Sequence, residues 1–313
     1  MTSNTLGALF AEHEMWLTVE RGLAANSLAA YRRDLRRYEQ FLRSRGIDDA
    51  RSVSEATVSE YVDYLGRLPA DDADGRLAPA SIARGLVAVR SFHRFCASEG
   101  LLDSDPSEQV GAPRVPQGIP KALDEPEIDA ILHSVVGNEP RAQRDRAILE
   151  VLYATGVRIS ELVGLDLADI DFDDGIARVL GKGDKERVVP MGRAARSELR
   201  AYCGDGRLAL RSPRAPRRDA DAVFLNARGG RLTRQGCWQL VRRAGERAGL
   251  GEQLSPHVLR HSCATHMLDH GADIRVVQEL LGHASISTTQ VYTKVSPERL
   301  RAVYESAHPR ARS

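Results

Sequence analysis

Apolar residues recur at helical spacing through the first hundred residues. One stripe returns every three or four positions and would form the buried face of a helix: Leu28, Tyr31, Leu35, Tyr38 and Leu42. Similar stripes predict helices over residues 5–21, 54–68 and 80–99. Between the last two, residues 70–75 are acidic and turn-rich, which predicts an exposed loop. The pattern indicates a small helical bundle.

The helical periodicity stops between residues 103 and 120. Prolines and a glycine replace it, at Pro106, Pro113, Pro116, Gly118 and Pro120. Such a stretch is typical of a linker, and 313 residues exceed what one ordinary core holds. We therefore predict a bundle over residues 1–108, a linker over 109–120 and a second domain over 121–313.

The second domain begins with a helix that Asp124 caps and continues with another at residues 144–153. Two extended segments, 176–180 and 187–189, flank a turn with two glycines, which predicts a β-hairpin. A short strand is predicted at 223–225, and residues 205–221 read as a mobile loop. Helices are predicted at 194–202, 235–248, 257–270, 274–281, around residue 292 and at 297–307. The fold class is therefore mainly α (α+β), with a small antiparallel sheet.

The composition narrows the setting of the protein. Its four cysteines lie far apart without a CxxC pair, which argues against a zinc ribbon or disulfide framework and fits a reducing cytoplasm. No apolar run approaches membrane-spanning length. Only four of the 44 basic residues are lysine: Lys121, Lys182, Lys185 and Lys294. Since lysine can lose a proton where arginine cannot, each deserves inspection as a candidate acid.

The segment between residues 257 and 292 concentrates the candidate chemistry. His257, Arg260 and His261 fall on one helix face because their spacings are three and four residues. The histidine pair would suit zinc, but Arg260 places a cation beside it and no glutamate follows the first histidine. The later histidines, His266 and His270, are assigned a structural role. We therefore favour a site that binds an anion over one that binds a metal.

A metal-free phosphoryl-transfer site needs paired arginines to neutralise the nonbridging oxygens. Arg260 is one candidate. Arg158 is the other, although by itself it is better explained as a surface residue paired with Glu161. In the bundle, a group of arginines at residues 32, 33, 36 and 37 would be either a solvated flank or a phosphate-binding face.

Five segments, taken together, resemble the conserved boxes of the tyrosine recombinases. In chain order they are TGVRISEL (155–162), GKGDKER (181–187), HVLRH (257–261), LGH (281–283) and TTQVYT (288–293). Residues 20–35 of the bundle resemble the SAM-like core-binding domain of the Xer subgroup. Cys263 and Met267 depart from the family, which usually has a larger apolar residue and a leucine there. The resemblance covers nearly the whole chain and implies a mostly helical catalytic domain.

The resemblance implies a catalytic set of six residues: Arg158, Lys182, His257, Arg260, His283 and Tyr292. Tyr292 would attack a DNA phosphate and form a 3′-phosphotyrosyl link. The two arginines and His283 would hold the nonbridging oxygens. His257 would accept the tyrosine proton or bind the phosphate. Lys182 would protonate the leaving 5′-oxygen.

The same resemblance implies site-specific recombination without a metal, ATP or other cofactor. The expected role is conversion of chromosome dimers to monomers at cell division. Its partners would be a duplex DNA recombination site, a second related recombinase in a heterotetramer, and a DNA translocase of the division apparatus, with no membrane. The alternatives are the partner-type Xer recombinase, a mobile-element integrase, a type IB topoisomerase and a non-catalytic DNA-binding protein.

Overall fold

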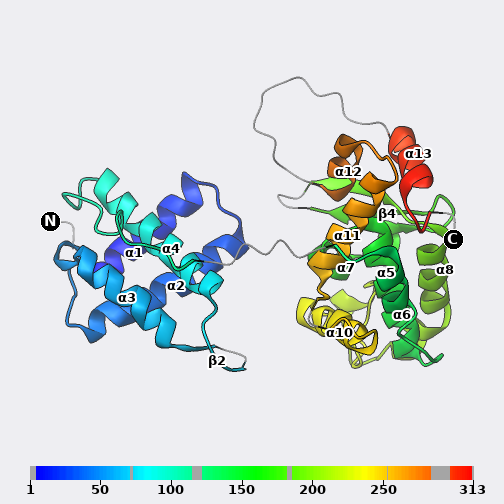
Figure 1. The fold of residues 1–313 in the computed structure, drawn as a ribbon. Helices are drawn as coiled ribbons and strands as arrows, with labels where there is room; N and C mark the ends of the chain where they lie inside the picture. Colours follow the sequence, from blue (N-terminus) through cyan, green and yellow to red (C-terminus); the bar gives the residue numbers. More distant parts are fainter. Residues whose placement is uncertain are drawn as a thin grey trace. The chain divides into compact units, whose positions relative to one another are not determined.

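The computed structural model describes residues 5–70, 73–114, 122–181, 185–251, 253–282 and 297–311. The chain divides into two compact units, Met1–Gln117 and Gly118–Ser313 (Figure 1). The limits predicted for the linker, 109–120, stay a prediction, because residues 115–121 lie outside the described parts.

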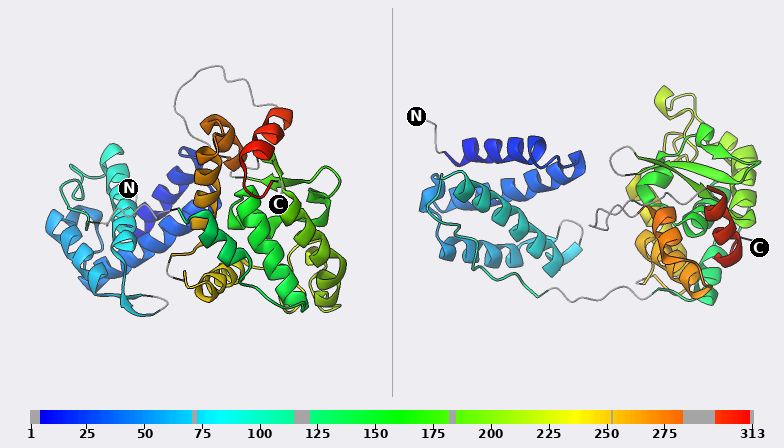
Figure 2. Two further views of the ribbon diagram at one scale, coloured as in Figure 1. Left: turned by 45° about the vertical axis from the view of Figure 1, so that its right-hand side comes forward. Right: turned by 90° about the horizontal axis from the view of Figure 1, so that it is seen from above.

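Four helices build the first unit: α1 (Leu6–Val19), α2 (Ala25–Ser44), α3 (Glu55–Arg67) and α4 (Pro79–Ser98), with a 3₁₀ turn η1 (Ala50–Ser52). The four predicted helices are thus confirmed. Ser54 caps α3 because its hydroxyl accepts the Thr57 N–H. α2 and α4 lie side by side, and Tyr38, Phe92 and Leu86 are fully buried between the helices (Figure 2). The apolar stripes predicted from the sequence therefore supply core residues of the bundle.

The stretch predicted as a loop between α3 and α4 is partly regular. Strands β1 (Pro69–Ala70) and β2 (Ala73–Arg76) pair antiparallel, with Pro69 opposite Arg76. The loop predicted over residues 70–75 is therefore wrong for Ala70 and for residues 73–75, which belong to these strands. The turn residues in this stretch indicate a chain reversal, but they do not show whether the residues on either side of the turn form paired strands.

The arginine group of α2 lies on the side of the helix that the bundle leaves open. Arg33 and Arg36 are exposed, and Arg32 pairs with Glu14. Together with Ala29, Arg37 and Gln40 they line a hollow of about 420 Å³. The hollow therefore has a cationic wall.

Two histidines are buried in the first unit. His13 Nε2 lies 3.0 Å from Ser91 Oγ, and His93 Nε2 lies 2.8 Å from Tyr38 Oη. Neither Nδ1 atom has a hydrogen-bond partner among the residues that the structure describes. Burial, partly offset at His13 by a hydrogen bond with Ser91, lowers the pKa of each imidazole to about 4. Both rings are therefore neutral in the folded unit near neutral pH.

We expect this unit to lose stability as the pH falls from about 6.5 to about 4, because in that window the unfolded chain binds protons at His13 and His93 that the fold excludes. Each histidine costs up to about 1.4 kcal/mol of unfolding free energy per pH unit there. The measurement is thermal unfolding against pH, followed by Trp16 fluorescence in a Trp238→Phe background, since the chain has two tryptophans.

A paired variant, Tyr38→Phe with His93→Leu, removes one titrating ring together with its hydrogen-bond partner. It should flatten the pH dependence by about one proton. An unchanged slope would show that other groups cause the acid loss.

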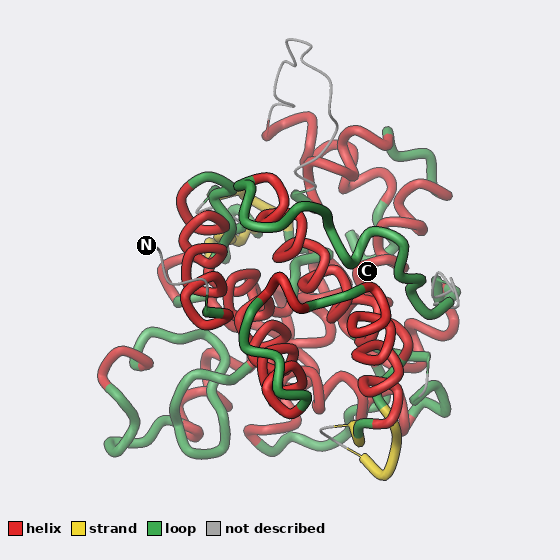
Figure 3. The backbone as a smooth tube through the Cα atoms, turned by 90° about the vertical axis from the view of Figure 1, so that its left-hand side faces the viewer, coloured by secondary structure: helices red, strands yellow, loops and turns green. Residues whose placement is uncertain are grey.

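The second unit has nine helices in its described part: α5 (Glu125–Leu132), α6 (Pro140–Thr155), α7 (Ile159–Gly164), α8 (Arg193–Ala201), α9 (Arg207–Leu210), α10 (Arg234–Arg247), α11 (Pro256–Asp269), α12 (Ile274–Leu281) and α13 (Pro297–Ala307). A three-stranded antiparallel sheet in the order β3 (Ile170–Asp171), β4 (Ile176–Leu180), β5 (Glu186–Pro190) completes it. In Figure 3, where helices are red and strands yellow, the strands are a small part of the described chain. The predicted mainly α fold with a small antiparallel sheet is confirmed.

Helix α6 forms the centre of this unit. Its last nine residues are all buried, and it packs against α8 and α11 (Figure 1). An apolar helix surrounded by others in this way is typical of a domain core. Helix α13 packs against α11, α12 and β5 of the same unit and buries Tyr304 and Ala307 there. No helix of the described ranges is long and apolar enough to cross a bilayer.

Two predictions for residues 205–225 are wrong. The stretch predicted as a mobile loop contains α9, a π-helical turn (Tyr202–Gly206) and a 3₁₀ turn (Arg217–Asp219). It is held by the buried Arg207, which donates to the Ala220 and Ala222 carbonyls. The predicted strand at 223–225 does not form: within it only Leu225 makes an isolated bridge, to Arg231, and the preceding Ala222 makes another, to Asp166. One buried arginine bonded to backbone supplies the order that the sequence pattern did not show.

Candidate active site

Arg158 is placed by the junction of α6 and α7. Gly156 ends α6 in the left-handed conformation, with φ of 58°, and a β-carbon there would lie 2.5 Å from Leu281 Cδ2. Val157 is buried, and Arg158 then caps α7. The turn is therefore fixed by a close approach that only glycine permits, and it directs Arg158 toward the end of α12.

Glu161 is the buried carboxylate beside this turn, with a side chain 3% exposed. Its Oε1 accepts Arg158 Nη1 at 2.9 Å and Arg187 Nη1 at 2.8 Å. Its Oε2 accepts the Arg158 backbone N–H at 2.7 Å and Arg187 Nη2 at 2.8 Å. Burial alone would raise the pKa of the carboxyl group, but the hydrogen bonds from Arg187 and Arg158 hold this pKa below its usual value. Glu161 is therefore ionised with all four acceptor positions filled.

Arg260 projects from α11 and is 7% exposed. Its Nη1 donates to the Gly156 carbonyl and its Nη2 to the Leu281 carbonyl, each at 2.6 Å. Burial and, to a lesser degree, the charge of the nearby Arg158 lower the pKa of its guanidinium to about 10. Arg260 therefore remains charged at neutral pH.

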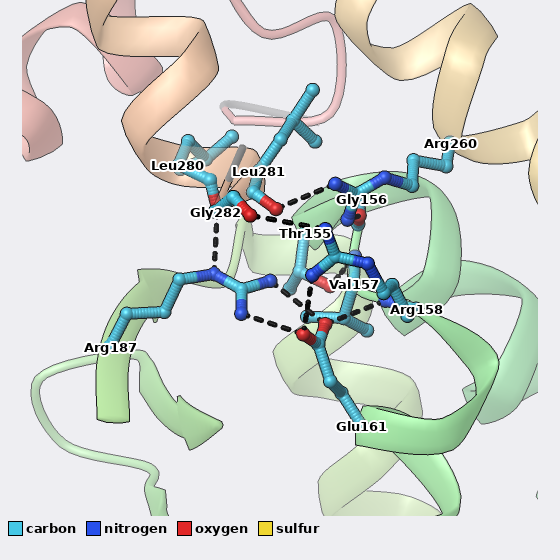
Figure 4. A network of polar contacts seen from close by, with 10 residues as sticks. All are labelled: Thr155, Gly156, Val157, Arg158, Glu161, Arg187, Arg260, Leu280, Leu281 and Gly282. Carbon is cyan, nitrogen blue, oxygen red and sulfur yellow. Dashed lines mark hydrogen bonds and ion pairs between the residues drawn. The ribbon is translucent and has the colours of Figure 1, made fainter. Parts of the chain in front are cut away.

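Three successive carbonyl groups at the end of α12 bind three arginines (Figure 4). The Leu280 oxygen accepts Arg187 Nε at 2.9 Å, the Leu281 oxygen accepts Arg260, and the Gly282 oxygen accepts Arg158 Nη2 at 3.0 Å. The last carbonyls of a helix lack intrahelical partners and carry the negative end of its dipole. This end of α12 therefore gathers cations from three different elements at one place.

The structure describes three of the six predicted residues and brings two of them together. Arg158 and Arg260 meet at successive α12 carbonyls, and His257 is exposed one helical turn before Arg260 on α11. Lys182, His283 and Tyr292 lie outside the described residues, as does the predicted helix around residue 292.

The structure does describe residues that border two of the undescribed segments: Gly181 and Lys185 around Lys182, and Gly282 before His283. Gly181 N donates to the Lys185 carbonyl at 2.8 Å, which closes the root of the β4–β5 hairpin. Gly282, whose carbonyl binds Arg158, immediately precedes His283. Gly181 and Gly282, the described residues that precede these segments, therefore lie beside the arginines.

The structural assignment of two histidines is confirmed. His266 is buried, with its Nδ1 2.9 Å from Tyr153 Oη. His270 Nδ1 lies 2.8 Å from the His266 carbonyl oxygen. Both side chains are thus engaged within the fold.

Arg187 also belongs to the arginine cluster at the end of α12, which was not predicted from the sequence although the residue stands in one of the five boxes. On β5 it shares the inward face with Val189, two residues on, where an apolar side chain is expected. The available signal was thus a charged residue at an inward strand position. The pairing with Glu161 could not be read from it, because 26 residues separate the two.

The comparisons cover both units. A model described as the phage integrase family matches residues 121–299, and one described as the phage integrase N-terminal SAM-like domain matches residues 11–100. The tyrosine recombinase XerD of Mycobacterium tuberculosis (strain CDC 1551 / Oshkosh) is 51% identical over 302 residues, 95% of this chain and 96% of that protein. XerD of Halalkalibacterium halodurans is 45% identical over 294 residues, 94% of this chain and 95% of that protein.

Solved structures share the fold. XerH bound to a palindromic difH substrate in a post-cleavage complex has a TM-score of 0.66 and 21% identity, over 96% of this chain and 84% of that one. A lambda integrase (75–356) dimer bound to a COC′ core site has a TM-score of 0.64 and 18% identity, over 93% and 100%. Taken with the two family models and the high identity over nearly the whole length, the chain belongs to the phage integrase family of tyrosine recombinases, in its Xer group.

Proposed function

We propose that this chain cuts and rejoins duplex DNA at a specific recombination site through a 3′-phosphotyrosyl intermediate on Tyr292. The observation that carries the proposal is the pair of guanidinium groups, Arg158 and Arg260, anchored to adjacent carbonyls of α12. A guanidinium has five N–H donors. Each of the two arginines makes two side-chain hydrogen bonds with the described residues, which leaves further N–H donors for the nonbridging oxygens of a phosphate.

In the proposed step the Tyr292 oxygen bonds to phosphorus as the bond from phosphorus to the 5′-oxygen breaks. His257 accepts the phenol proton. The leaving oxygen takes the electron pair of the broken bond and a proton from the Lys182 ammonium, which gives a free 5′-hydroxyl. Arg158, Arg260 and His283 stabilise the charge on the nonbridging oxygens. One phosphoester bond is exchanged for another, so religation needs no ATP.

The proposed arginine clamp does the work that a metal ion does in other phosphoryl-transfer sites. The pKa of Arg260, lowered to about 10, still leaves it protonated at neutral pH. We therefore propose a reaction that requires neither a metal nor another cofactor.

We further propose that the enzyme acts in the cytoplasm and converts chromosome dimers to monomers at cell division. It would work with a second, XerC-like recombinase, two subunits of each on paired sites, under a DNA translocase. What supports this is the similarity to proteins named XerD over 94% or more of the chain. The cationic face of α2 would bind phosphates of the same duplex. An XerC-type role or a mobile-element integrase remain the alternatives within the family.

The test is a duplex that carries a candidate chromosomal site with a nick beside the cleavage position, so that the short cut strand diffuses away. We expect a protein-DNA adduct stable in detergent, joined to the 3′ side of the break and formed equally well in EDTA without ATP. Absence of an adduct, a 5′ linkage or a need for Mg²⁺ would refute the proposal.

A second assay separates the recombinase from a type IB topoisomerase. Two duplexes are incubated with this protein and the partner recombinase. Strand exchange between them is expected only when both duplexes carry the recombination site. Relaxation of a supercoiled plasmid that lacks the site would favour the topoisomerase.

A further inference from the structure

Arg187 is the one arginine of the cluster at the end of α12 to which the proposed reaction gives no part. It reaches the cluster from β5, whereas Arg158 and Arg260 come from the start of α7 and from α11 (Figure 4). Its side chain is 15% exposed and lies against Gly282, where a β-carbon would approach its Cζ to 3.1 Å. Arg187 is therefore packed within the site and is not a surface residue.

The bonds of Glu161 show what Arg187 supplies. A carboxylate offers about four acceptor positions, and two of the four at Glu161 are filled by the Arg187 fork. The other two are filled by Arg158, one from its backbone and one from Nη1. Only one of the five side-chain N–H groups of Arg158 is thereby held by Glu161.

Removal of Arg187 would leave a buried carboxylate with two empty acceptor positions. An unmet acceptor in such a place is costly, so the nearest donor is drawn to it. Arg158 is that donor, since its Nη1 already touches Oε1 and its guanidinium can form the same bidentate fork. A rotation of the Arg158 guanidinium would bring more of its N–H groups to Glu161. The same rotation would move them away from the Gly282 carbonyl and from any bound phosphate.

We propose that Arg187 is a positioning residue of the recombination reaction: it saturates Glu161 so that the guanidinium of Arg158 stays available for the DNA phosphate. The inference rests on the proposed function, because it gives Arg158 a phosphate to bind. The bond from Arg187 to the Leu280 carbonyl fixes the fork in place, two residues before the carbonyl that holds Arg158. Lysine cannot replace it, since an ammonium has no planar fork to fill both carboxylate oxygens and reach Leu280.

The test is single-turnover cleavage of the nicked duplex at saturating protein in a double-mutant cycle. We expect Arg187→Gln to slow adduct formation by roughly 30- to 100-fold, and Arg187→Lys by a similar factor. In an Arg158→Gln background, Arg187→Gln should slow it by no more than about threefold, because the group it positions is gone. Equal effects in both backgrounds, or no effect in either, would overturn the proposal.

Arg178→Gln is the matched control. Arg178 lies on the neighbouring strand β4, is exposed, and has no side-chain hydrogen bond or ion pair with the described residues. Its loss should change the cleavage rate less than about twofold. If wild type, Arg178→Gln and Arg187→Gln all cleave the duplex at the same rate, the inference about Arg187 is refuted while the proposed function stands. Lack of an adduct with wild type would refute the proposed function and the inference with it.

A substrate with sulfur in place of the bridging 5′-oxygen tests a competing route through Lys182. A thiolate leaves without a proton, so this duplex restores a variant whose defect is in protonation of the leaving group. We expect the Arg187→Gln defect to persist on it, and full recovery would overturn the assignment to Arg158. If Arg187→Gln loses its thermal transition, Arg187→Gln with Glu161→Gln removes both charges. No carboxylate then draws Arg158 away, so this double variant should cleave within about threefold of wild type, and a defect of roughly 30-fold or more would overturn the proposal.

Discussion

Replacement of Tyr292 by phenylalanine is expected to abolish the protein-DNA adduct while DNA binding stays within about twofold of wild type. Phenylalanine keeps the ring and lacks the oxygen that would bond to phosphorus. The expected loss of cleavage is on the order of 10⁴-fold or more, since removal of a nucleophile removes the reaction path itself. Adduct formation on the nicked duplex and a gel-shift titration measure the two quantities separately.

Tyr304→Phe is the control for this variant, because Tyr304 is the other tyrosine of the C-terminal segment. It is buried, burial raises the pKa of its phenol, and its oxygen accepts the Gly192 N–H at 2.8 Å. Its loss should leave the adduct intact and lower the stability by about 1–3 kcal/mol through the unmet N–H. An adduct that persists in Tyr292→Phe, or maps to another tyrosine, would contradict the assignment of the nucleophile.

Local patterns predicted much of the fold because local physics decides those parts. The stripe that includes Tyr38 and Leu42 is buried in α2, as its spacing requires. Asp124 caps α5 in a capping box with Glu127. The aspartate before the helix was enough to predict this cap. The hairpin of β4 and β5 follows from two extended runs around glycines.

Other elements depend on contacts between residues distant in sequence, and no local pattern encodes them. Residues 205–221 are rich in arginine, proline and glycine, which is typical of a loop. Burial of Arg207 on two carbonyls gives that stretch its order. Periodicity could not indicate whether Arg207 faces solvent or the interior.

The candidate site shows the same division. The sequence singled out Arg158 and Arg260 because their boxes resemble a family. It gave no sign that backbone carbonyls of residues 280–282 would hold them, since a carbonyl group is common to every residue type. The resemblance therefore located the chemistry, and the packing of α12 against β5 and α11 showed how the side chains are fixed.

Replacement of Arg260 by glutamine should have the second largest effect. It removes a charge from the clamp and leaves the Gly156 and Leu281 carbonyls without the fork that now serves both. Cleavage of the nicked duplex is expected to slow by roughly 10³-fold, the scale on which loss of a transition-state cation acts. The protein should also lose about 1–3 kcal/mol of stability, measured by denaturant unfolding, because two buried carbonyl groups lose the donors that Arg260 supplies.

The two consequences of Arg260→Gln can be separated by a substrate in which a methyl group replaces one nonbridging oxygen at the cleaved phosphate. That linkage is neutral, so a second guanidinium has less charge to stabilise, whereas the unmet carbonyls are unchanged. On this duplex the variant should come within about tenfold of wild type, although its stability stays low. An equal deficit on both substrates would mean that Arg260 serves only to tie Gly156 to Leu281, and the arginine clamp would then consist of Arg158 alone.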